Sequence, residues 1–376
     1  MDARQGHLGA LAAVGLALVA GCGEEGAPPA EVSSAEIFPD PDWRVESAAE
    51  HGLDQGGLEA VALYVGEHHS DCLLVVHGGV LVGEWYWREG GPEVRKADVF
   101  SVTKSITSAL VGIAQGEGRL SVDDPASKTI EAWRGTPSEG VTIRQILGNE
   151  SGRRWDFATD YLEMAAEAPD KTAFAIGLDQ QHGPGEVWEY NNSAIQVLER
   201  VLEVSTGEDP GDYARRRLFE PLGMGADYGR DEAGNALMFA GVGASCRDLA
   251  RFGLMILREG RWVGGLQVVP AQWVRDSTQP STALNAAYGW MWWLNQEGPA
   301  VLPSTPLRRE GAGPLVPSAP LGLVSAIGIQ GQIVAISPAD DLVVVRLGDL
   351  PFNGDLVGDK FLGALWERLE PALPGR

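Results

Sequence analysis

The segment Phe100-Ser101-Val102-Thr103-Lys104-Ser105 places a serine and a lysine three positions apart in this chain of 376 residues. A helix is predicted to begin at Ser101 and to end near Gly116 and Gly118, because one apolar stripe runs through Val102, Ile106, Ala109, Leu110 and Ile113. Lys104 then lies one turn after Ser101 on the same face. A serine hydroxyl becomes a good nucleophile when a base takes its proton, and lysine is such a base once burial lowers its pKa. The spacing therefore makes Ser101 and Lys104 candidate catalytic residues.

The segment Glu186-Val187-Trp188-Glu189-Tyr190-Asn191-Asn192-Ser193 supplies the second part of the candidate site. Ser-x-x-Lys alone is a weak motif, since it also fits a helix-capping serine beside an exposed lysine. A tyrosine beside a lysine ammonium has its phenolate stabilised, so Tyr190 could relay the Ser101 proton to a leaving group. Asn192 is predicted to support the site by binding Lys104 and a substrate carbonyl through its amide. The alternatives are that Tyr190 packs into a turn and that Asn192 caps the following helix.

Strand patterns occur near both ends of the chain, and helical patterns lie between them. The first pattern predicts a β-hairpin, Cys72 to His77 and Val80 to Trp87, around the turn Gly78-Gly79. Later strands are predicted from Leu323 to Ile329, Gln332 to Ile336 and Leu342 to Leu347, and helices from Leu58 to Val65, Ser193 to Leu202 and Leu356 to Leu369. Residues 120–235 lack convincing strands. We therefore predict an α+β fold in which one antiparallel sheet, flanked by N- and C-terminal helices, carries an inserted all-helical domain.

Ser-x-x-Lys followed by Tyr-x-Asn resembles the pattern of the serine β-lactamase and D-alanyl-D-alanine carboxypeptidase superfamily, on its class C β-lactamase-like branch. Further similar segments are Gly116 to Pro125, Val141 to Leu147, Ser151-Gly152, Leu218 to Gly223, Arg247 to Gly253 and Tyr288-Gly289-Trp290. The resemblance implies a β-lactamase/transpeptidase-like fold for a catalytic domain over residues 41–376. Its α/β part would take residues 41–100 and 236–376, and its helical part residues 101–235.

The third motif of that superfamily departs from the usual pattern. Counted back from Ile336-Ser337-Pro338, the motif falls on Ala326-Ile327-Gly328, where Ala326 replaces the usual Lys or His. The segment from Ala326 to Gln332 is similar to that of 6-aminohexanoate-dimer hydrolases and related esterases. The resemblance implies an oxyanion hole made by the backbone N–H groups of Ser101 and Ile329, with Gly328 and Gln332 at the substrate. For Gln332, a polar residue that faces the sheet is an equally good interpretation.

These motifs favour a serine hydrolase that cleaves a linear amide or ester through a Ser101 acyl-enzyme, with Lys104 and Tyr190 as the acid–base pair and no cofactor. A β-lactamase or D-alanyl-D-alanine carboxypeptidase is the alternative, and it needs another cation for the substrate carboxylate, such as Arg153 or Arg154. A non-catalytic cell-wall-binding or sensor lipoprotein is the alternative from another class. Five tryptophans could line an acyl pocket, although core packing is the favoured interpretation: Trp155, Trp188, Trp290, Trp292 and Trp293.

The N-terminal residues indicate export. An apolar run from Leu8 to Ala20 is too short to span a bilayer but suits a signal peptide. It ends in Val19-Ala20-Gly21-Cys22, which resembles a bacterial lipobox. We therefore expect a lipoprotein signal peptide over residues 1–22 with Cys22 as the lipidation site, and a disordered tether over residues 23–40. The lipid anchor would hold the catalytic domain in the periplasm or at the cell surface, at the outer membrane because Gly23 follows the cysteine. An ordinary signal peptide is the alternative.

Composition restricts the partners. The formal net charge of -23 repels phosphate backbones, so we expect a small-molecule or peptide-like amide or ester substrate and no nucleic acid. His68-His69-Ser70-Asp71 is predicted to be a solvated loop, not a metal site, since HExxH and a second ligand cluster are both missing from the sequence. Cys72 and Cys246 could form one disulfide, but their apolar neighbours favour buried free thiols.

Overall fold

The computed structural model describes residues 36–88, 95–303, 308–351 and 357–375. The predicted signal peptide, Cys22 and the tether as far as residue 35 lie outside the described residues. One compact unit begins at Ile37. Phe38 packs against Trp262, with ring centroids 5.3 Å apart, so the packed unit includes the last residues of the predicted tether. Within the described ranges, the longest apolar helices fall short of what is needed to cross a bilayer.

A six-stranded antiparallel sheet forms the centre of this unit. Its strands lie in the order β2 (Val80–Tyr86), β1 (Ser70–His77), β13 (Leu342–Gly348), β12 (Gln332–Ser337), β11 (Val324–Gly328) and β8 (Trp293–Leu294). The predicted hairpin turns at Gly78 and Gly79, which both have positive φ. The prediction of one sheet built from both ends of the chain is confirmed.

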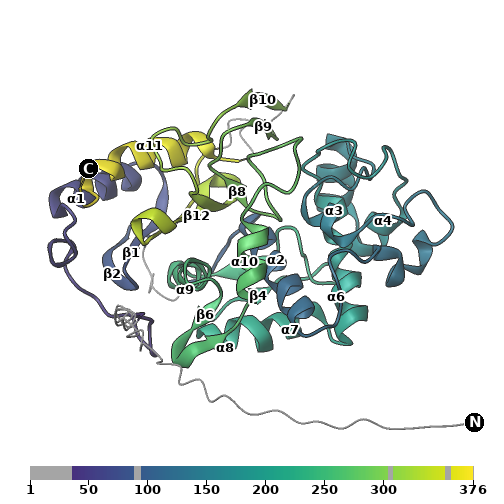
Figure 1. Cartoon of the computed structure of the whole chain (residues 1–376), viewed down its shortest axis with the longest axis horizontal. Helices are drawn as coiled ribbons and strands as arrows, with labels where there is room; N and C mark the ends of the chain where they lie inside the picture. The colour runs from purple at the N-terminus through teal and green to yellow at the C-terminus, as the bar shows by residue number, and fades with distance from the viewer. Residues whose placement is uncertain (1–35, 89–94, 304–307, 352–356, 376) are drawn as a thin grey trace, which may run out of the picture. The chain divides into compact units, whose positions relative to one another are not determined.

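Helices cover both faces of the sheet (Figure 1). Alternate residues of β1 serve the two faces: Leu73 and Val75 point toward α1 (Gln55–Gly66) and α11 (Asp359–Leu369), whereas Leu74 and Val76 belong to the core beneath α9 (Cys246–Leu257). The predicted N- and C-terminal helices are therefore confirmed. Residue 356, with which the C-terminal helix was expected to begin, lies outside the described residues.

Helix α2 (Val102–Gly116) lies between the sheet and the helical part of the chain, and its residues from Val102 to Ala114 are all buried. The helical part contains α3 (Ile143–Leu147), the π-helix η4 (Ala158–Glu167), α4 (Lys171–Gly177), α5 (Asn192–Gln196), α6 (Leu198–Thr206), α7 (Pro210–Ala214), η5 (Arg215–Phe219) and α8 (Glu220–Leu222). The helix predicted from Ser193 to Leu202 is thus two helices, which meet at Val197. A short strand, β4 (Asp227–Tyr228), also falls where no strand was expected, because two residues are too few to show an alternating pattern.

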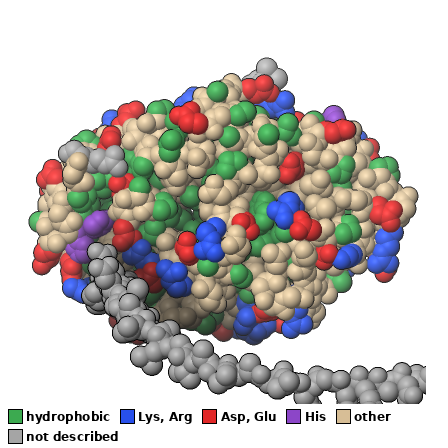
Figure 2. Space-filling model, viewed as in Figure 1, with side chains coloured by type: hydrophobic (Ala, Val, Ile, Leu, Met, Phe, Trp, Pro, Cys, Tyr) green, Lys and Arg blue, Asp and Glu red, His purple; other side chains and the backbone are tan. Residues whose placement is uncertain are grey.

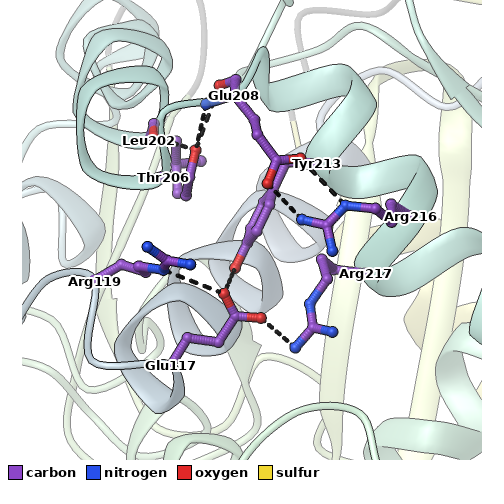
Figure 3. A network of polar contacts seen from close by, with 8 residues as sticks. All are labelled: Glu117, Arg119, Leu202, Thr206, Glu208, Tyr213, Arg216 and Arg217. Carbon is purple, nitrogen blue, oxygen red and sulfur yellow. Dashed lines mark hydrogen bonds and ion pairs between the residues drawn. The ribbon is translucent and has the colours of Figure 1, made fainter.

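A polar network fixes the C-terminal end of α2 to the helical part (Figure 3). Glu117, the C-cap residue, forms ion pairs with Arg217 and Arg119 and accepts a hydrogen bond of 3.2 Å from the Tyr213 hydroxyl. A carboxylate is unfavourable beside the carbonyl groups that end a helix. The two arginines offset this repulsion, and Tyr213 connects the network to α7.

Cys72 and Cys246 form a disulfide, so the prediction of free thiols is wrong. Both residues are buried, as expected, but Cys72 lies in β1 on the face that α9 covers, and Cys246 is the first residue of α9. Their Cα atoms are 6.7 Å apart. Apolar neighbours indicate burial equally well for paired and unpaired cysteines, and a pairing over 174 residues of sequence depends on the tertiary structure alone.

Candidate active site

Ser101 occupies a turn that immediately precedes α2. The residue before it, Phe100, has a φ of 47°, a left-handed conformation that is costly for a residue with a side chain. The end of β11 lies against this turn: a Cβ atom on Gly328 would sit 2.5 Å from Val99 O and 3.2 Å from Ser101 N. Gly328 therefore allows the strand to approach the Ser101 backbone, and Ile329 follows it directly.

Lys104 is buried and reaches Ser101. The residue is only 1% exposed, and its Nζ lies 2.9 Å from Ser101 Oγ and 2.8 Å from Phe239 O. Burial lowers the pKa of Lys104 to about 7, although the negative charge of Asp160 acts in the opposite direction. A substantial share of this amine is therefore unprotonated near neutral pH. The interpretation of Lys104 as an exposed lysine is wrong.

Tyr190 completes the group. The Lys104 Nζ lies 4.7 Å from the centroid of its ring, and its hydroxyl shares a hydrogen bond with Ser101. Burial raises the pKa of Tyr190 above its ordinary value, against the effect of the Ser101 hydrogen bond. This direction is opposite to the expected stabilisation of a phenolate. Tyr190 is therefore protonated near neutral pH, where part of the Lys104 amine is unprotonated.

Two buried side chains that sequence reasoning missed hold the loop around Tyr190. The first is Asn149, which has a φ of 60°. Its backbone oxygen accepts a hydrogen bond of 2.9 Å from Glu189 N, and its Oδ1 accepts one of 3.1 Å from Asn191 N. The residues on both sides of Tyr190 are therefore fixed to one anchor.

The second is Asp160, from η4. Its carboxylate accepts hydrogen bonds from the backbone and side chain of Asn192, at 3.1 and 2.8 Å, and from the backbone and hydroxyl of Ser193, both at 2.7 Å. Burial raises the pKa of Asp160, while the Ser193 and Asn192 hydrogen bonds and the Lys104 charge oppose that rise. The Asn192 NH₂ group is thus engaged by Asp160, and Asn191, not Asn192, caps α5 by accepting from Ala194 N.

The third-motif segment contributes backbone, not charge, to the site. Ala326 is buried in β11 opposite Val334, so no charged side chain stands at that position. The Gln332 side-chain amide forms two hydrogen bonds with the backbone of Gly348. Its NH₂ group donates to the Gly348 oxygen at 2.6 Å, and its Oε1 accepts from the Gly348 N–H at 3.0 Å. Gln332 therefore joins β12 to β13, and the prediction that it contacts the substrate is not supported by its hydrogen bonds.

The two arginines considered as carboxylate partners are committed elsewhere. Arg153 is buried, donates to Ser138 Oγ and to the backbone oxygens of Ala175 and Ile176, and has its pKa lowered to about 10 by burial. Arg154 forms ion pairs with Asp156 and Asp179. Within the described ranges, the His, Cys, Asp and Glu side chains form no group suited to a metal ion.

Four of the five tryptophans are buried, and two of them surround the candidate acid. Trp293 stacks on Tyr190 with ring centroids 5.7 Å apart, and Trp188 lies 6.5 Å from it. Trp290 and Trp292 lie in the core that contains α2. Trp155 is partly exposed. These positions agree with the core interpretation and leave the tryptophans to shape the surroundings of Tyr190.

Comparisons with known proteins agree with the fold. The family described as Beta-lactamase matches residues 45–362. The chain is 26% identical to a 6-aminohexanoate-dimer hydrolase of Paenarthrobacter ureafaciens over 313 residues, which cover 75% of this chain and 73% of the relative. A penicillin-binding protein homologue from Caulobacter crescentus has a similar fold, with a TM-score of 0.63 and 14% identity over 84% of this chain and 97% of that one. EstCE1, a hydrolase with promiscuous acyltransferase activity, gives a TM-score of 0.65 and 14% identity over 86% and 100%. The chain belongs to the beta-lactamase family.

Proposed function

We propose that the protein is a serine hydrolase that cleaves linear amide or ester bonds through an acyl-enzyme on Ser101. The observation that carries this proposal is the buried Lys104 amine, which lies 2.9 Å from Ser101 Oγ with a pKa of about 7. A lysine with an ordinary pKa would be protonated at neutral pH and could not accept the serine proton. Burial therefore supplies a base at the place where a nucleophile needs one.

In the first step, Ser101 Oγ attacks the substrate carbonyl carbon, and its proton moves to Lys104 Nζ. The negative charge that develops on the carbonyl oxygen would be held by the N–H groups of Ser101 and Ile329, which the close approach of Gly328 brings toward each other. Such donors stabilise the transition state most when they are fixed before the reaction.

In the second step, the carbonyl re-forms and the amine or alcohol departs. Tyr190 donates its phenolic proton to the leaving group, and the Lys104 ammonium returns a proton to Tyr190. Water then attacks the acyl-enzyme while Lys104 and Tyr190 accept and pass on its proton, which releases the acid and restores Ser101. The raised pKa of Tyr190 keeps the phenol protonated and so able to donate, and a proton on the adjacent Lys104 would favour that donation by stabilising the phenolate left behind.

The substrate class follows from the residues around the nucleophile. Ala326 offers no charge, and Arg153 and Arg154 already have partners. A substrate carboxylate would thus find little support there, which favours neutral linear acyl groups over β-lactams or peptidyl-D-alanine. The 6-aminohexanoate-dimer hydrolase is named for a linear amide, which supports the linear amide but not the lack of charge, because that dimer carries an amine and a carboxylate.

The proposal is tested by labelling the protein with a fluorescent fluorophosphonate and by measuring hydrolysis of p-nitrophenyl esters, linear amides and nitrocefin. We expect label on the wild type, no label on Ser101→Ala, and faster turnover of esters or linear amides than of nitrocefin. Label that persists in Ser101→Ala would sink the proposal. Preference for nitrocefin would assign the protein to the β-lactamases instead.

We further propose that the enzyme is lipid-anchored in the cell envelope. The Cys72–Cys246 disulfide supports an oxidising compartment. Figure 2 shows acidic and basic side chains interspersed over one face of the protein, which suits a small substrate better than a polyanion. Metabolic labelling with a fatty acid should mark the wild type but not Cys22→Ala. Equal labelling of both proteins would contradict the anchor.

A further inference from the structure

Arg346 is a buried cation behind the end of β11 that the catalytic steps above do not use. It lies in β13, opposite Leu73 of β1 and Ile333 of β12, and is 0% exposed. Burial lowers its pKa to about 10, so it remains protonated at neutral pH. A buried charge is expensive unless hydrogen bonds compensate for it.

All five N–H groups of Arg346 have acceptors, and each acceptor is uncharged. Nε donates to Ser70 Oγ at 2.9 Å, and Nη2 donates to the backbone oxygens of His68 and His69 at 2.9 and 3.0 Å. Nη1 donates to the backbone oxygens of Gln330 and Gly331 at 2.7 and 2.9 Å. The guanidinium group is therefore satisfied in its hydrogen bonds by uncharged acceptors. Asp71 and Asp349 act on its charge through space, but neither carboxylate is hydrogen-bonded to it.

The turn that Nη1 holds is the one that follows Ile329. Gln330 has a φ of 65° and Gly331 a φ of 77°, so the turn contains two consecutive left-handed residues, one of which carries a side chain. A Cβ atom on Gly331 would lie 2.8 Å from Arg346 Nη1. The guanidinium group and the turn are thus packed together closely, and the two hydrogen bonds hold a conformation that this sequence does not favour by itself.

We propose that Arg346 is a positioning residue for the oxyanion hole: it fixes the Gln330–Gly331 turn so that the Ile329 N–H faces Ser101, and it places behind that N–H a positive charge to which no carboxylate is hydrogen-bonded. This inference rests on the proposed function. The charge acts from behind the strand and does not reach the substrate side, where Ala326 stands. Arg346 therefore stabilises the developing oxyanion without selecting for a substrate carboxylate, which agrees with neutral acyl substrates.

The test compares Arg346→Gln and Arg346→Lys with the wild type in ester hydrolysis and in binding of a phenylboronic acid, which forms a tetrahedral adduct with a nucleophilic serine. We expect kcat to fall about 100-fold in Arg346→Gln and about 10-fold in Arg346→Lys, which keeps the charge but not the fork of donors. KM should change little, and boronate affinity should fall in parallel with kcat, which a merely structural role would not produce.

Arg258→Gln is the matched control. Arg258 holds Asp341, at the turn between β12 and β13, on the opposite end of these strands. The Arg258→Gln substitution should lower the midpoint of thermal unfolding and leave kcat and boronate affinity unchanged. Folded Arg346→Lys with wild-type kcat and boronate affinity would overturn the inference, even if Arg346→Gln does not fold. A wild type without turnover or fluorophosphonate label would instead contradict the proposed function.

Discussion

The two ends of helix α2 carry charges of the wrong sign for a helix, and the protein treats them in opposite ways. Lys104 lies in the first turn, where a cation is disfavoured, and Glu117 caps the last turn, where an anion is disfavoured. Glu117 is surrounded by Arg119, Arg217 and the Tyr213 hydroxyl (Figure 3). Lys104 is buried beside a hydroxyl and a backbone oxygen.

This difference shows how burial decides what a charge does. The C-terminal network keeps Glu117 partly exposed and pairs it with opposite charges, so it contributes to holding helices together. At the N-terminal end, the partners that Lys104 contacts are uncharged, so burial lowers its pKa and the amine loses its proton near neutral pH. The same helix thus carries a compensated charge at Glu117 and, at Lys104, a buried amine beside uncharged acceptors, which the proposed function uses as its base.

The largest effect is expected when the Lys104 amine is removed. Lys104→Met should reduce kcat/KM about 1000-fold or more, because Ser101 loses its base. Lys104→Arg should not rescue activity, since a guanidinium group does not give up its proton at neutral pH. Thermal unfolding of Lys104→Met should begin no lower than in the wild type, because an apolar side chain replaces a buried amine. An active Lys104→Arg variant would contradict the assignment of Lys104 as the base.

An intermediate effect is expected from Asp160→Asn. In the wild type, kcat/KM should decrease as the pH is lowered below about 7, because Lys104 becomes protonated. Asp160 raises the Lys104 pKa, so its neutral replacement should move this acid limb to lower pH. Tyr190 and Tyr161 are the other titratable groups coupled to Asp160. The rate at the optimum should also drop about 10- to 100-fold, because the loop with Tyr190 loses part of its anchor.

Asp156→Asn is the control for this pH profile. Asp156 accepts hydrogen bonds from Thr159, near the start of η4, and is partly exposed. Its replacement should leave the acid limb where it is in the wild type. An acid limb that is unchanged in Asp160→Asn would show that Asp160 has no influence on the base.

The smallest effect is expected at the compensated end. Glu117→Gln should lower the free energy of unfolding by about 1 kcal/mol or less, since partly exposed ion pairs contribute little. Urea unfolding at low and high salt measures this, and the difference from the wild type should shrink as salt screens the pairs. Ester hydrolysis should remain within about twofold of the wild type. A large loss of kcat would instead show that the two ends of α2 are coupled.

The proximity of Ser101, Lys104 and Tyr190 could be predicted from the sequence because the signals for it are local. Ser101 and Lys104 share one turn of a helix, and Tyr190 belongs to a short motif with a fixed spacing. The long strands and the flanking helices could be predicted for a similar reason, because their apolar residues recur with the period of a strand or a helix. Both kinds of signal depend on residues that are close in the chain.

The supporting groups could not be predicted, because their partners are distant in sequence. Asp160 lies 32 residues from Asn192, and Asn149 lies 42 from Asn191. Arg346 contacts residues more than 270 positions away. Gln332 shows that a predicted contact can also be left open by the sequence. A polar residue at a strand end can face a substrate or the neighbouring strand, and the sequence pattern is the same in both cases. Tertiary contacts alone decide between these outcomes.

The disulfide between β1 and α9 has a consequence for cleaved protein. Residues 72–246 form a closed covalent loop that contains Ser101, Lys104 and Tyr190, whereas Ile329 lies beyond it. A protease that cuts the backbone once within this loop cannot release a fragment, because the new ends remain joined through the sulfur atoms. Under oxidising conditions, which keep the disulfide intact, nicked protein would therefore hold Ser101, Lys104 and Tyr190 on one connected molecule.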